Sequence, residues 1–345
     1  MNSRKIVVTG ASGFVGSCVV EALFTAGGYE IVPTARRLIA GARVARFGCR
    51  LQPTDLTDRA AVKELVKGAE AVVHCAFGGA ADHEQLIPAL LEESAAAGVR
   101  CFIHISTTEA YESQQGTLDE DSPLQSSGNE YGAVKARIDA QVRSYADKFP
   151  NLVILRPGII YGPLSDSWTV TPIKRLLQGW SPDLNTMQGI GGFVHIADVC
   201  RTILLLLSRP VSGLRVYNLV GPEVVTWANY FEMLRKALQI AASAQKTGVS
   251  EKAKLGVVRL LLKKLPTGFR RKITNLVTSV PVGGRMVAGW RRLHLVEPMS
   301  ADKVLYARTV RYSNARLIQD GLAPRVNLTE GIQQSATWAR QVGLV

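Results

Sequence analysis

The 345-residue chain has 47% hydrophobic and 20% charged residues, which suits a soluble globular protein with one large α/β domain and a smaller lobe. Its longest aliphatic run, residues 203–207, is far shorter than the roughly 20 residues of a membrane-spanning helix and predicts a buried helix instead. Five scattered cysteines without a CxxC pair argue against disulfides and a zinc site. No secretory leader precedes the first strand, so we expect a cytoplasmic protein. We also expect no metal site.

Residues 5–23 predict a strand, a glycine turn and an amphipathic helix. Gly10, Gly13 and Gly16 form a GxxGxxG motif at the turn. Glycines there let backbone N–H groups approach a pyrophosphate at the N-terminus of the helix. The alternative is a tight strand-to-helix turn that binds nothing. We predict a dinucleotide site with contacts from Gly10, Ser12, Gly13, Phe14, Val15 and Gly16.

The second predicted strand ends where an acidic residue would contact the adenosine ribose of a dinucleotide. Thr34 falls near that place, and Arg36 and Arg37 follow it. An acid would repel a 2′-phosphate, whereas an arginine can pair with it through two hydrogen bonds. The sequence therefore favours NADP over NAD. The alternative is two solvated surface arginines.

Asp55 and Leu56 follow the third predicted strand. The Asp55 carboxylate can contact the adenine amine of the cofactor. It can instead cap a helix that starts near Asp58, a role that Thr57 or Asp58 could also take. Both interpretations remain open from the sequence.

The fourth predicted strand ends at His74, for which we expect packing in the core. Cys75 and Ala76 follow it, beside the predicted path of the cofactor. A helix over residues 83–97 and a strand over residues 99–105 continue the alternation. This order of strands and helices predicts a right-handed, doubly wound, Rossmann-like parallel sheet.

Tyr131 and Lys135 are four residues apart, which on a helix places the phenol and the ammonium on one face. A tyrosine pKa near 10 must fall by about three units for acid/base work near pH 7, equivalent to roughly 4 kcal/mol. The Lys135 cation can supply that stabilisation. With the hydroxyls of Ser106 and Thr107 upstream, the pattern predicts a proton exchange that accompanies hydride transfer. The alternative is an ordinary surface tyrosine and lysine.

Several motifs in this order resemble the extended short-chain dehydrogenase/reductase family of NAD(P)-dependent epimerases and dehydratases. The resemblance covers most of residues 4–240, and residues 321–338 look like the end of the family's chain. The motifs are GASGFVG (10–16), Asp55-Leu56, VVHCA (72–76), Ser106-Thr107, YGAVK (131–135), RPGIIYGP (156–163) and FVHIAD (193–198).

The resemblance implies a domain organisation. Residues 1–165 would form the NAD(P)-binding domain, to which residues 193–220 would return. Residues 166–192 and 221–345 would form a smaller C-terminal substrate-binding lobe.

The resemblance also implies roles for single residues. Thr107 would hydrogen-bond the reacting oxygen, with Ser106 as an accessory group, and Lys135 would also hold the nicotinamide ribose. The cofactor and substrate cleft would be lined by Arg156, Pro157 and Tyr161.

The family's dehydratases carry an Asp-Glu pair where this chain has Thr108-Glu109. Thr108 has no proton to exchange near neutral pH, so the pair is broken. Glu109 can still serve as a base, or only as a solvated or capping carboxylate. Redox or epimerase chemistry is therefore favoured over dehydration. Thr108 could still contact the substrate. Trp168 could stack a substrate ring or pack in the core.

The net charge of +13 is concentrated in residues 246–292, which contain twelve lysines or arginines and one acid, Glu251. This segment could contact an anionic membrane surface, form a basic lid over the substrate, or be a solvated helical hairpin. No nucleic-acid reader motif is present.

The leading hypothesis is an NAD(P)-dependent oxidoreductase or epimerase that acts on a secondary alcohol or ketone of a nucleotide sugar. The alternatives are a reductase of a lipophilic, steroid- or flavonoid-like alcohol at a membrane face, and an NADP-binding sensor without turnover. We expect a small-molecule substrate and a homodimer.

Overall fold

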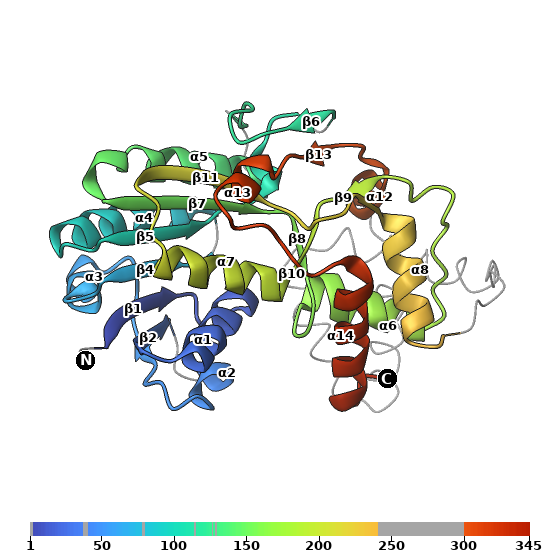
Figure 1. Ribbon diagram of the computed structural model, residues 1–345, viewed down its shortest axis with the longest axis horizontal. Helices are drawn as coiled ribbons and strands as arrows, with labels where there is room; N and C mark the ends of the chain where they lie inside the picture. The colour runs from blue at the N-terminus through green and yellow to red at the C-terminus, as the bar shows by residue number, and fades with distance from the viewer. Residues whose placement is uncertain are drawn as a thin grey trace, which may run out of the picture.

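The computed structural model describes residues 3–36, 41–77, 80–113, 115–125, 127, 130–240 and 300–345. A seven-stranded sheet forms its centre, in the order β11-β7-β5-β4-β1-β2-β3 (Figure 1). Every strand pair in this sheet is parallel, which confirms the predicted doubly wound architecture. The strands are β1 (Arg4–Thr9), β2 (Tyr29–Ala35), β3 (Gln52–Pro53), β4 (Ala71–His74), β5 (Cys101–Ile105), β7 (Asn151–Pro157) and β11 (Gly213–Leu219).

Helices cover both faces of the sheet because alternate strand residues point to opposite sides. Ile6 and Val8 pack under α1 (Phe14–Ala26) and α7 (Ile196–Ser208), which lie side by side on one face. Val7 points the other way. The helices on that face are α3 (Arg59–Val66), α4 (Ala80–Ala96) and α5 (Tyr131–Arg143). The aliphatic run 203–207 lies in α7, as predicted.

The strand order reverses between β1 and β4, because the chain proceeds to β2 and β3 on one side of β1 and to β4 and β5 on the other. In sheets of this type, ligands bind in the crevice at the carboxyl ends of the strands beside such a reversal. At this edge the last residues of the two strands are joined, since the Thr9 hydroxyl and His74 Nδ1 are 2.7 Å apart. His74 is fully buried.

A second apolar core lies beside the carboxyl edge of the sheet, with Trp227 and Tyr230 at its centre. Its helices are α6 (Thr171–Leu177), α8 (Trp227–Ala237) and α14 (Leu328–Gln341). Short strands frame it: β8 (Ile159–Tyr161) with β10 (Phe193–His195), and β9 (Ile190–Gly191) with β12 (Val225–Thr226). A π-helical turn, η4 (Asp166–Val170), precedes α6.

The C-terminal segment crosses back toward the main sheet (Figure 1). After α12 (Ser300–Ala307), β13 (Arg311–Tyr312) pairs with β6 (Thr117–Leu118), and α13 (Ala315–Gln319) packs on β11. The remaining elements are the short helix α2 (Ala42–Ala45) and the 3-10 turns η2 (Thr108–Ala110) and η3 (Ala146–Lys148).

Two predicted boundaries shift in the structure. The helix predicted over 83–97 starts at Ala80, and the strand predicted over 99–105 starts at Cys101. The basic segment 246–292 lies outside the described residues. Among the described helices, none combines the length and the apolar character needed to cross a bilayer.

Candidate active site

The glycine turn leaves no room for side chains at two of its three positions. Gly10 has a φ of +67°, and a Cβ added to it would lie 2.5 Å from the Ala76 backbone nitrogen. A Cβ on Gly16 would collide with the Gly10 carbonyl oxygen. The turn is closed by the Gly13 N–H, which donates to the same oxygen at 2.9 Å. Helix α1 begins after Gly13, and no side chain caps it.

This turn has the chemistry of a pyrophosphate site. The uncapped N–H groups and the positive end of the α1 dipole favour an anion. Glycine allows the close approach of backbone that such binding needs. The residues present therefore fit a dinucleotide, with the partly buried side chains of Ser12, Phe14 and Val15 around the turn.

The residues predicted to contact the adenosine end occupy different environments. Arg36 is exposed immediately after β2, while Arg37 lies outside the described residues. Asp55 is exposed and accepts hydrogen bonds from the Thr57 N–H and hydroxyl at 3.0 and 2.8 Å, which lower its pKa. The cap of α3 is Asp58, which accepts from two backbone N–H groups. Leu56 is buried in the core below.

Cys75 and Ala76 follow β4 at the predicted cofactor path. The Cys75 N–H donates to the Thr9 carbonyl at 3.2 Å, which extends the pairing of β1 and β4 by one residue. Burial raises the pKa of the Cys75 thiol to about 12, so the thiol stays protonated near neutral pH. Cys75 and Ala76 therefore contribute backbone surface opposite Gly10.

Thr107 and Tyr131 come together at the carboxyl edge of the sheet. Thr107 is 7% exposed, caps η2 by accepting from the Glu109 N–H at 3.2 Å, and lies close enough to Tyr131 to affect the pKa of its hydroxyl. Tyr131 is the first residue of α5, and 48% of it is exposed. Packing around its hydroxyl raises the pKa of Tyr131, Thr107 opposes this shift, and the Glu109 charge reinforces it.

Lys135 lies one turn further along α5 and is 4% exposed. Its ammonium donates to the Ile105 carbonyl at 2.9 Å and lies 4.8 Å from the ring centre of Phe77. The rings of Phe77 and Tyr131 pack edge to face, with their centres 5.1 Å apart. Burial lowers the pKa of Lys135 to about 8. Burial is the largest influence on the Tyr131 pKa in this structure, and it raises that pKa, whereas acid/base work near pH 7 requires a lower one.

Arg156 departs from the predicted substrate role. It is fully buried, and its guanidinium donates to both carboxylate oxygens of Asp139, at 2.9 and 3.1 Å. It also donates to the Tyr111 hydroxyl at 2.9 Å and to the Glu120 carbonyl. A buried guanidinium needs such partners to offset its desolvation, and these contacts leave it facing the interior of the protein.

Asp139 is a buried hub that the sequence did not single out. Besides Arg156 it accepts from Arg143 at 2.9 Å and from the Ser106 hydroxyl at 3.2 Å. Ser106 therefore faces Asp139 while its neighbour Thr107 faces Tyr131. The spacing in the sequence could have pointed to Asp139, because it follows Lys135 by four residues and so lies on the same face of α5.

Thr108 and Glu109 both lie next to the C-terminal segment. Thr108 is 3% exposed and lies close enough to Tyr312 of β13 to oppose the rise in pKa that burial causes in that tyrosine. Both carboxylate oxygens of Glu109 accept from Arg308 at 2.8 Å. The Glu109–Arg308 pair borders a cavity of about 430 Å³ beside Tyr131. The cavity is lined by Glu109, Glu112, Gln125, Ser127, Glu130, Tyr131, Gly132 and Arg308.

The remaining predicted substrate residues lie in the second core. Tyr161 is 2% exposed and packs against Phe193 and His195, and burial raises its pKa well above the ordinary value. Trp168 is half-buried, with its ring centre 5.5 Å from that of Trp227. Pro157, which was predicted to contact the cofactor, lies outside that core and is buried at the end of β7. These positions favour packing roles over substrate contact.

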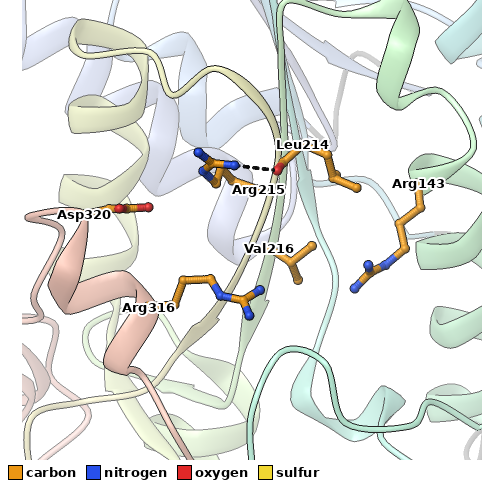
Figure 2. Close-up of a pocket in the computed structure, with 6 residues that line it drawn as sticks. All are labelled: Arg143, Leu214, Arg215, Val216, Arg316 and Asp320. Atoms are coloured by element: carbon orange, nitrogen blue, oxygen red, sulfur yellow. Dashed lines mark hydrogen bonds between the residues drawn. The ribbon is translucent and has the colours of Figure 1, made fainter.

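A second cavity, of about 350 Å³, lies at the start of β11 and at the end of α5 opposite Tyr131 (Figure 2). Three guanidinium groups border it, but two of them are already paired, Arg143 with Asp139 and Arg316 with Asp121. Its position away from the carboxyl edge separates it from the candidate site. Its lining residues are Arg143, Leu214, Arg215, Val216, Arg316 and Asp320.

Comparison with known proteins identifies the family of this chain. The model of the NAD dependent epimerase/dehydratase family matches residues 6–220. The low-salt glycan biosynthesis protein Agl12 of Haloferax volcanii is 30% identical over 238 residues, which are 62% of this chain and 76% of that protein. A UDP-glucose 4-epimerase of Corynebacterium glutamicum is 28% identical over 67% of this chain and 80% of its own length.

Solved structures show the same fold. The UDP-glucuronic acid 4-epimerase of Bacillus cereus, in complex with NAD, superposes with a TM-score of 0.71 at 18% identity, over 98% of this chain and 99% of that one. The match of the family model to residues 6–220 includes the glycine turn, Thr107, Tyr131 and Lys135. The chain belongs to the NAD dependent epimerase/dehydratase family of enzymes.

Proposed function

We propose that this enzyme acts on a secondary alcohol of a nucleotide sugar and either inverts its configuration or changes its oxidation state. Tyr131 is the acid/base. The observation that carries the proposal is the placement of the Thr107 side chain beside Tyr131 at one sheet edge, with Lys135 one helical turn away. The glycine turn that fits a pyrophosphate lies at the same sheet edge. Curated relatives act on UDP-glucose and on dTDP-glucose.

The proposed roles follow from the contacts. Thr107, which lies beside Tyr131, presents its hydroxyl to the reacting oxygen of the substrate. Tyr131 takes the proton of that oxygen, or returns it, as the carbon is oxidised or reduced. A bound nicotinamide supplies the hydride acceptor or donor. Lys135, protonated over most of the range below its pKa of about 8, provides the positive charge that stabilises a tyrosinate.

Epimerase or ketoreductase chemistry is favoured over dehydration. Dehydration needs a second acid/base pair, and residue 108 is a threonine, which has no proton to exchange near neutral pH. The Glu109 carboxylate is engaged with Arg308. For the cofactor we propose NADP, because Arg36 is exposed directly after β2, where a 2′-phosphate would lie.

The test is Tyr131→Phe, which removes the exchangeable proton and keeps the ring. With UDP-glucose and the bound cofactor, we expect turnover to fall by about a thousandfold or more. Cofactor affinity, measured by fluorescence titration, should change less than about threefold, because the glycine turn is untouched. Tyr145→Phe is the matched control, since this tyrosine lies after α5 and bonds Glu92. Retained turnover in Tyr131→Phe would remove the mechanism.

A further inference from the structure

The cavity beside Tyr131 contains an ion pair joining parts of the chain that are far apart in sequence. Glu109 belongs to η2, next to Thr107, and Arg308 follows α12. Both oxygens of the carboxylate lie 2.8 Å from Arg308 Nη1. The side chains are 36% and 22% exposed, so the pair borders the cavity instead of being sealed in the core.

The Arg308 backbone is fixed in place by its neighbours. Its carbonyl accepts from the Ile190 N–H at 2.7 Å, and its N–H donates to the Leu305 carbonyl at 3.3 Å. Gly189 packs so closely that a Cβ there would lie 2.7 Å from the Arg308 nitrogen. The η2 turn is held similarly, because Gln125 donates from its side chain to the Glu109 carbonyl at 2.7 Å and from its backbone N–H to the Ala110 carbonyl at 2.9 Å. The ion pair therefore joins two anchored segments.

The rest of the charged lining is acidic. Glu112 and Glu130 also border the cavity, and Arg308 is the single cation among its described lining residues. Because Glu109 already neutralises Arg308, the two other glutamates determine the sign of the local charge. A carboxylate entering this space would find no unpaired described cation and would be repelled by both glutamates.

We infer that the Glu109–Arg308 pair is a specificity determinant that admits a neutral, hydroxyl-bearing sugar ring next to Tyr131 and rejects a ring that carries a carboxylate. Hydroxyl groups can donate to the glutamates and accept from Arg308 without a net charge entering the cavity. The inference rests on the proposed function, since it takes the substrate ring to lie within reach of Tyr131.

The experiment compares UDP-glucose with UDP-glucuronic acid, which differ only in a hydroxymethyl group against a carboxylate. Binding is measured by calorimetry on the full chain. We expect UDP-glucose to bind about tenfold or more tightly than UDP-glucuronic acid. In Glu109→Gln, Arg308 is released to pair with the ligand carboxylate, and this ratio should shift by about tenfold toward UDP-glucuronic acid.

Glu112→Gln is the matched control, because it removes the same charge from the same cavity without releasing Arg308. Its ratio should move less than about threefold. An equal shift in both variants would show that net charge alone decides, and would overturn the role of the pair. An unchanged ratio in Glu109→Gln would overturn it as well. If folded wild-type protein binds neither nucleotide sugar nor UDP, the proposed function fails and the inference falls with it.

Discussion

Replacing Lys135 with methionine should make the protein more stable near neutral pH while it abolishes turnover. The lysine is 4% exposed, and burial lowers its pKa from 10.5 to about 8. Below pH 8 the folded protein carries a charged ammonium that would be better solvated in the unfolded chain. Methionine is unbranched, has a similar length and has no charge to desolvate.

The size of the effect follows from the two pKa values. A fall from 10.5 to about 8 is equivalent to roughly 3 kcal/mol of unfolding free energy, lost by the wild type at any pH below 8. The variant loses the hydrogen bond to Ile105 and the contact with the Phe77 ring, each worth about 1 kcal/mol. We therefore expect Lys135→Met to gain about 1 kcal/mol at pH 7.

The pH dependence of the stability difference between wild type and variant is the sharper test. Above 10.5 the lysine is neutral in both states and the penalty vanishes, and it grows to its full size as pH falls to 8. Denaturant unfolding should therefore show that the stability advantage of the variant falls between pH 8 and 10.5 and then reverses, because the wild type is freed of the penalty while the variant still lacks the Ile105 hydrogen bond. Lys63→Met, on the exposed side of α3, controls for the loss of a surface charge. A variant that is less stable at pH 7, or a gap independent of pH, would refute this reasoning.

Three further predictions concern the supports of the site. Gly16→Ala places a Cβ against the Gly10 carbonyl, so the protein should lose about 2 kcal/mol or more of stability and bind cofactor at least tenfold more weakly, by unfolding and fluorescence titration. Arg156→Met leaves Asp139 buried without its main partner and should cost about 3–5 kcal/mol in denaturant unfolding. Arg36→Gln should weaken NADP binding about tenfold and leave NAD binding unchanged, and equal effects on both would exclude a 2′-phosphate contact.

The sheet and the glycine turn could be predicted because their signals are local. Period-two strands, glycines at fixed spacing and the four-residue interval between Tyr131 and Lys135 report on neighbours along the chain. The sequence left Asp55 open between two roles. The structure shows that Asp58 caps the helix and that Asp55 is bound by Thr57.

The roles of Arg156 and Glu109 could not be predicted because they depend on partners that are distant in sequence. Arg156 was predicted to line the cleft, yet it is buried by contacts with Asp139 and Tyr111. Glu109 was left open between a catalytic and a solvated role, and its partner Arg308 lies 199 residues away. Such pairings follow from how the C-terminal segment crosses the sheet edge, and no local pattern encodes that path.

The placement of α7 and β11 has a consequence for synthesis on the ribosome. One face of the sheet, with Ile103 and Val153, is covered only when Ile203 and Leu206 of α7 arrive. About 50 residues separate the end of β7 from the end of α7, which takes roughly 3–10 seconds to translate. During that interval an apolar face of the nascent chain is open. A fragment that stops at residue 165 would keep it open, and should aggregate or remain bound to chaperones.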